Sequence, residues 1–247
     1  MAARTDPLKR RTDRLLLLLW LGLEADLWRL TQEALQGARS PYLLPTALRE
    51  ALLQAHLAAA ALGWQRGAHG QTLPPKGIPA ALAQRVAQEQ TRYLQGFAED
   101  VRTGRYRAHS RGLRWRSHLY ANRLVGTANA AWREAVADAS ATDEAVRLAG
   151  AVGEPLVLWV LGDAREHCDT CQTEAKAGWR RASTLERVPG DGTTECNVGC
   201  TCALRTQAGV RSFSLRDLKD AAIQLAPPGG ILSVRDLNAM RRRARAG

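Results

Sequence analysis

All five cysteines of this chain lie within one 35-residue stretch, which constrains the fold more than any other feature. Their spacing is Cys168-x2-Cys171 and then, after 24 further residues, Cys196-x3-Cys200-x-Cys202. Zinc takes four soft ligands at tetrahedral corners, and a C-x2-C turn brings two of them together. The spacing therefore predicts a structural metal site, with zinc as the expected ion. Cys168 and Cys171 are the firmest ligands, and two of the remaining three complete the set of four.

Other uses of these cysteines stay open on spacing alone. His167 is an alternative ligand, although adjacent residues seldom both point at one ion. The thiols could also be buried small side chains, disulfides, or a redox dithiol at 168 and 171, although no βαβ unit precedes that pair. A catalytic zinc is not expected, because four cysteines leave no open corner for water and no H-x-E motif is present.

The remaining composition favours helices. Ala and Leu dominate the 247 residues, while β-branched and aromatic side chains are scarce, and this bias favours helix over sheet. We expect a mainly α fold, in which an N-terminal helical module precedes a small α+β module stapled by zinc. The expected divisions are a basic arm at 1–11, a helical module at 12–150, a Cys-rich module at 151–206, and C-terminal helices with a basic tail at 207–247.

Apolar residues at helical spacing, together with Gly and Pro breaks, set the expected elements. Tyr93 and Trp115 are both expected to face inward. A short apolar, β-favouring run at 155–161 reads as a strand that leads into the cysteines, and loops with one hairpin are expected over 172–195. The expected helices are 13–35, 46–63, 79–102, 113–139, 143–149, 214–225 and 233–245.

The chain is strongly basic, with a net charge of +11 carried mostly by arginine. No acid occurs between Val101 and Arg133, where aromatic residues alternate with arginines. Such surfaces could contact phosphates without reading base sequence, or could bind acidic protein partners. The candidate contacts are Arg105, Arg107, Arg111, Arg114, Arg116, Arg241, Arg242, Arg243 and Arg245.

Motifs for catalysis and for membrane insertion are absent from the sequence. It contains no G-x-S-x-G, Walker loop, H-E-x-x-H or G-x-G-x-x-G, so we do not expect an enzyme. The apolar run Leu15–Leu23 has nine residues, whereas a transmembrane helix needs about 20. We therefore expect no membrane association and a cytosolic site of synthesis.

Three segments, taken in order, resemble one family. They are Tyr120-Ala-Asn-Arg-Leu-Val-Gly-Thr-Ala-Asn129, then Trp159-Val-Leu-Gly-Asp163-Ala-Arg165, and then the C-x2-C and C-x-C pairs. The chain resembles the phage Mu F-like minor head proteins, or head-morphogenesis proteins, over about residues 45–205 and most specifically over 117–204. The matching positions are Trp159, Asp163, Arg165, Cys168, Cys171, Cys200 and Cys202.

Two positions depart from the family pattern. Cys196 stands near the place of a family His, one residue further from the C-x-C pair, and leaves the fourth ligand open. Thr201 replaces the Arg between the last two cysteines.

The resemblance implies a minor capsid protein without catalytic activity that acts in prohead assembly at or near the portal. Its partners would be the portal protein and other capsid or scaffold subunits, with nonspecific contact to packaged DNA. Its location would be the prohead or virion, and the host cytoplasm during assembly. The alternative function is a nonspecific nucleic-acid-binding zinc protein that is packaged or ejected with the phage genome.

Overall fold

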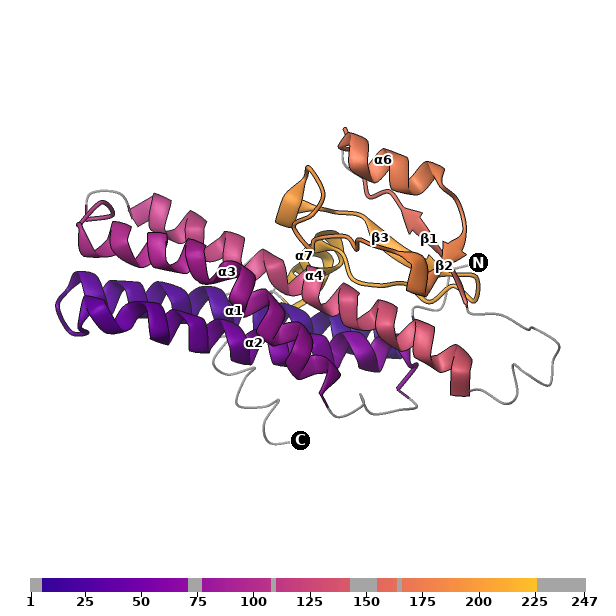
Figure 1. The fold of residues 1–247 in the computed structure, drawn as a ribbon, viewed down its shortest axis with the longest axis horizontal. Helices are drawn as coiled ribbons and strands as arrows, with labels where there is room; N and C mark the ends of the chain where they lie inside the picture. The colour runs from indigo at the N-terminus through magenta and orange to yellow at the C-terminus, as the bar shows by residue number, and fades with distance from the viewer. Residues whose placement is uncertain (1–5, 71–76, 108–109, 143–154, 164–165, 226–247) are drawn as a thin grey trace.

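The computed structural model describes residues 6–70, 77–107, 110–142, 155–163 and 166–225. Four long helices lie side by side and a small sheet with one short helix lies against them (Figure 1). The expected fold, a mainly helical chain with a small α+β region around the cysteines, is confirmed. The long helices are α1 (Pro7–Leu35), α2 (Leu44–Gly67), α3 (Ile78–Arg102) and α4 (Ser110–Thr142).

Helix α1 begins earlier than expected, since residues 7–11 form its first turns and not a separate arm. The Asp6 side chain caps the helix by accepting the backbone N–H of Leu8 at 2.9 Å, and Pro7 suits the first helical position. Lys9 then pairs with Asp13 and with Asp217 of the C-terminal segment, both at 2.7 Å. Local capping and a distant carboxylate together order these residues.

Helices α2 and α4 pack with their backbones in close approach. An added Cβ at Gly63 would lie 2.0 Å from the carbonyl oxygen of Ala128, and one at Gly67 would lie 2.6 Å from that of Trp132. The neighbouring Ala59 is fully buried. The small side chains along this face therefore allow the two helices to meet.

Two aromatic residues that were expected to face inward are exposed instead. Tyr93 is 68% exposed and Trp115 is 62% exposed, whereas Leu94 and Leu113 are buried. In α3 the buried stripe thus includes Leu94 in place of Tyr93. In α4 the buried aliphatic side chain lies two residues before the tryptophan. The consequence is that the helical module presents aromatic rings to solvent beside its arginines.

The small module is built on a three-stranded antiparallel sheet with the order β2-β1-β3. Its strands are β1 (Leu156–Val160), β2 (Arg180–Arg181) and β3 (Ala203–Thr206). Helix α6 (Asp169–Lys176) occupies part of the stretch where loops with one hairpin were expected. The remaining elements are the 3-10 turns η1 (Pro41–Leu43), η2 (Ala182–Thr184) and η3 (Asn197–Gly199), and helix α7 (Leu215–Leu225).

Two hydrophobic cores meet along α4. One fills the space between the long helices, and the other joins the C-terminal half of α4, through residues such as Trp132, to Trp159 of β1 and to the cysteines. Phe213 and Leu218 belong to the first core, so the segment after residue 206 packs on the helical module.

A buried arginine ties this C-terminal segment to the bundle. The Arg66 guanidinium pairs with Asp13, lies 3.4 Å from the centre of the Phe213 ring and donates to the carbonyl of Ser212. The chain therefore returns to the N-terminus of α1 after leaving the sheet.

Several predicted features lie outside the described residues. These are the helices expected at 143–149 and 233–245, Arg165, and the arginines Arg241, Arg242, Arg243 and Arg245. Within the described part of the chain, none of the helices combines the length and the apolarity needed to cross a membrane.

Candidate metal centre

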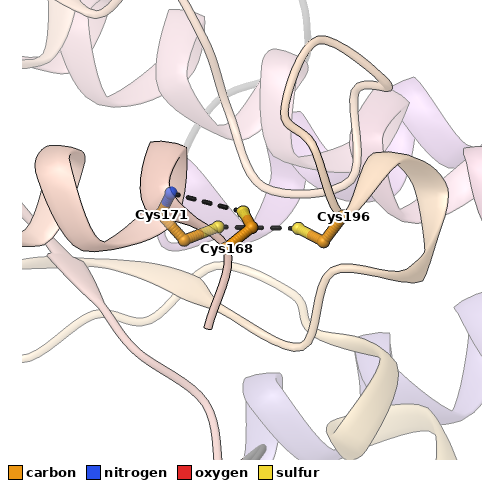
Figure 2. Close-up of side chains that lie close together, drawn as sticks. All are labelled: Cys168, Cys171 and Cys196. Atoms are coloured by element: carbon orange, nitrogen blue, oxygen red, sulfur yellow. Dashed lines mark hydrogen bonds between the residues drawn. The ribbon is translucent and has the colours of Figure 1, made fainter. Parts of the chain in front are cut away.

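The five cysteines come together from three short segments around the edge of the sheet. Cys168 is the N-cap of α6 and Cys171 lies in its first turn. Cys196 and Cys200 flank the turn η3, and Cys202 directly precedes β3. Figure 2 shows Cys168 and Cys171 at the start of α6, facing Cys196 on the opposing loop. The C-x2-C spacing thus acts as a helix N-terminus and not as the simple tight turn expected.

The sulfur atoms form two groups that share one member. Cys168, Cys171 and Cys196 lie within 4.8 Å of one another, and so do Cys171, Cys200 and Cys202. The Sγ atom of Cys171 lies 3.6 Å from those of both Cys196 and Cys200. Sulfur atoms around one tetrahedral zinc ion stand about 3.8 Å apart. The cluster could therefore hold a metal ion without large rearrangement.

All five side chains are free thiols, and no disulfide joins them. Cys171, Cys200 and Cys202 are each 1% exposed, whereas Cys168 and Cys196 are partly exposed. Buried reduced thiols side by side are a soft donor set.

Neighbouring groups shift the pKa values of the thiols in opposite directions. A hydrogen bond from Cys200 lowers the pKa of Cys202 to about 5, against the effect of burial and with help from the backbone of Gly162 and from Trp159. The same contact and burial raise the pKa of Cys200, and burial chiefly raises that of Cys171. Burial acts to raise the pKa of Cys168, but hydrogen bonds from the backbone and the thiols of Cys171 and Cys196 together outweigh it and lower this pKa. A metal ion would replace the protons that these thiols now share.

His167 lies closer to the cluster than its sequence position suggested. Its Nδ1 atom is 3.8 Å from Sγ of Cys202, and its Nε2 atom is 3.1 Å from the carbonyl oxygen of Gly162. Cys168 and His167 are adjacent, yet each faces a different part of the cluster. The pairing of β1 with β3 explains this position, because it brings the segment after Val160 beside Cys202.

The Tyr120–Asn129 segment is where the small module docks on α4. Asn129 donates through Nδ2 to the carbonyls of Pro189 and Phe213, at 2.9 and 3.0 Å, and accepts the N–H of Phe213 at 2.8 Å. An added Cβ at Gly126 would lie 2.2 Å from the carbonyl oxygen of Gly190. The segment therefore positions the loop that precedes Cys196.

Other motif residues also have structural partners. Asn122 accepts the indole N–H of Trp20 at 2.9 Å, and Arg123 pairs with Glu89 of α3 at 2.7 Å. Asp163 pairs with Arg216 of α7 at 2.7 Å. These contacts join elements that are distant in sequence.

The basic stretch of the sequence is partly neutralised by acids from other helices. Asp100 pairs with Arg105 at 3.1 Å and with Arg116 at 3.5 Å, while Glu24 of α1 lies 3.8 Å from Arg114. Arg107 and Arg111 are exposed and, among the described residues, have no acidic partner within 4 Å.

An exposed aromatic face lies on α4 beside these arginines. The Trp115 ring stacks on His118 with centroids 5.7 Å apart, and His118 in turn meets Trp20 edge-on at 4.9 Å. The exposed Trp115 ring is thus supported by His118, which in turn packs on Trp20.

Comparison of the chain with models of protein families, with curated proteins and with solved structures finds no match. The described structure provides a helical bundle with a docked cysteine module, whose thiols could hold a metal ion.

Proposed function

We propose that this chain is a phage minor head protein that acts in prohead assembly at or near the portal. The observation that supports this most is the meeting of three sequence motifs at one junction. The α4 motif, through Asn129, holds the loop before Cys196, while Trp159 of the second motif lies in the same core as the cysteines. Residues that resemble one family in sequence thus cooperate in one structural unit.

We further propose that the cluster holds zinc in a structural role. The close donors are sulfur atoms, which select zinc and other soft ions over magnesium or calcium. The apolar core around the sheet is small, and small units of this kind usually need a metal or disulfide to be stable. The metal would hold α6, η3 and β3 in register, and the proposal includes no catalytic step.

In this role the helical bundle would be the part that docks. Its long helices would contact portal, capsid or scaffold subunits, and the cysteine module would brace α4. The exposed arginines near the α3–α4 connection, including Arg107 and Arg111, suit a partner with an acidic surface.

Co-sedimentation with purified portal protein tests the proposal. The full-length chain, loaded with zinc, should pellet with assembled portal rings at physiological salt. The double variant Arg107→Ala/Arg111→Ala removes the two exposed arginines. It should keep its fold but pellet less than the unmodified chain. Absence of association by the unmodified chain, both with portal rings and with proheads, would contradict the proposed role.

A second candidate function is nonspecific nucleic-acid binding, which the aromatic face on α4 favours. The exposed Trp115 ring could stack on a base while Arg111 and Arg114 contact phosphates. Affinity that falls steeply with salt would support this function.

A further inference from the structure

The cluster offers more soft donors than one metal ion can use. Five sulfur atoms and Nδ1 of His167 make six donors, whereas a tetrahedral ion takes four. The sulfurs do not form one set of four either: in the described structure the mutually close groups are two triads, and Cys171 is the member that they share.

We propose that the cluster holds two metal ions bridged by the Cys171 thiolate. The outer ion takes Cys168, Cys171 and Cys196. The inner ion takes Cys171, Cys200, Cys202 and His167. The inference rests on the proposed structural metal site and extends it in the number of ions and in the use of His167 as a ligand.

The orientation of His167 supports its role as a ligand. Nε2 lies 3.1 Å from the Gly162 carbonyl, which can only accept a hydrogen bond, so Nε2 carries the proton. Nδ1 then presents its lone pair, and it is this atom that lies 3.8 Å from Sγ of Cys202. A metal-bound imidazole characteristically donates its other N–H to a carbonyl or carboxylate in this way.

The surroundings of the inner triad suit an ion that is shielded from water and coordinated by four protein ligands. All three thiols are 1% exposed, and Nδ1 of His167, which lies beside Cys202, would move closer to the other two sulfurs to take the fourth corner. Gly162 permits this closure, because an added Cβ there would lie 2.4 Å from Oγ1 of Thr201, between Cys200 and Cys202. The ion would therefore be sealed between the end of β1 and the C-x-C pair.

The outer triad lies nearer to solvent. Cys168 and Cys196 are both partly exposed, so the fourth corner of the outer ion is open to a water molecule. Seven bonds from the protein and one from water then satisfy two tetrahedral ions, and no soft donor of the cluster is left unused.

Charge balance is compatible with two ions. Two divalent ions with five thiolates carry a net charge of −1, whereas one divalent ion with four thiolates carries −2 and one held by Cys171, Cys200, Cys202 and His167 carries −1.

Metal stoichiometry of the full-length chain tests the inference. Elemental analysis should give two zinc ions per chain, and titration of the metal-free chain with Co²⁺ should saturate at two equivalents. The two cobalt ions should couple magnetically through the shared thiolate, which lowers the paramagnetic resonance signal per ion. One ion per chain would overturn the two-ion cluster and leave the single structural site intact, whereas no metal would remove both.

The variant His167→Gln tests the inner ion separately. It should bind the second equivalent of Co²⁺ more weakly than the unmodified chain, with the helical content unchanged, because a water molecule replaces the imidazole on the inner ion. The matched control His118→Gln, on the distant half of α4, should bind both ions as the unmodified chain does, and equal affinity for the second ion in both variants would overturn the role of His167. If His167→Gln does not fold, the stoichiometry of the unmodified chain still decides between one ion and two.

Discussion

Replacing Gly126 with alanine should loosen the attachment of the cysteine module to α4. The new Cβ would lie 2.2 Å from the carbonyl oxygen of Gly190, whereas an ordinary contact needs about 3.4 Å. The loop must therefore retreat by roughly 1 Å. It cannot do so freely, because Asn129 holds the adjacent carbonyl of Pro189 at 2.9 Å.

The expected magnitude follows from two opposing effects. Overpacking of this kind costs about 1–3 kcal/mol, and the greater helix propensity of alanine returns up to about 1 kcal/mol. We expect Gly126→Ala to lower the free energy of unfolding by about 1–2 kcal/mol. Gly96 of α3 is the matched control, because an added Cβ there meets nothing within 4 Å. Gly96→Ala should stabilise the protein by about 0.5–1 kcal/mol.

Urea unfolding of the two variants, followed by circular dichroism at saturating zinc, measures both effects. Hydrogen exchange should place the weakening of Gly126→Ala in residues 185–214. If Gly126→Ala were as stable as Gly96→Ala, the close backbone contact would not be what docks the module.

Three further outcomes are expected. Burial lowers the pKa of His56 to about 3, with Arg123 adding to the effect. Below about pH 6.5 the unfolded chain therefore binds a proton at His56, whereas the folded chain does not. The free energy of unfolding should fall by about 3 kcal/mol between pH 7 and pH 4.5 for this reason. Urea unfolding at both pH values measures this loss, and an equal loss in His56→Gln would rule out His56 as its source. Chelation of the metal should remove hydrogen-exchange protection from residues 168–202 before the long helices, and simultaneous loss everywhere would contradict a local staple. If nucleic acid binds the α4 face, Arg111→Ala/Arg114→Ala should reduce the salt dependence of oligonucleotide binding by about 2 in log–log slope, and Arg85→Ala should leave it unchanged.

The sequence predicts the long helices well because their signals are local. Pro and Gly mark their ends, and the apolar period marks their buried faces. It fails at Tyr93 and Trp115, because periodicity does not say which of two neighbouring apolar residues is covered. The packing of neighbouring helices makes that choice, and Leu94 and Leu113 are buried instead.

The start of α1 and the end of the cysteine module depend on contacts between distant segments. Lys9 pairs with Asp217, and Arg66 packs on Phe213. No local pattern indicates these pairs, so the sequence places the start of the first helix at residue 13, whereas α1 begins at Pro7.

At the candidate metal centre the cysteine spacing was sufficient to predict that the thiols meet. It did not predict that Cys168 caps a helix that begins at Asp169, because cysteine is an unusual N-cap residue. Nor did it indicate that His167 faces Cys202, since this depends on the pairing of β1 with β3.

X-ray absorption at the zinc edge of the purified full-length chain identifies the atoms bound to the metal. A site built from these cysteines should show zinc surrounded mainly by sulfur at about 2.3 Å. A protein without zinc, or zinc surrounded only by nitrogen and oxygen at about 2.0–2.1 Å, would contradict a metal site built from these cysteines.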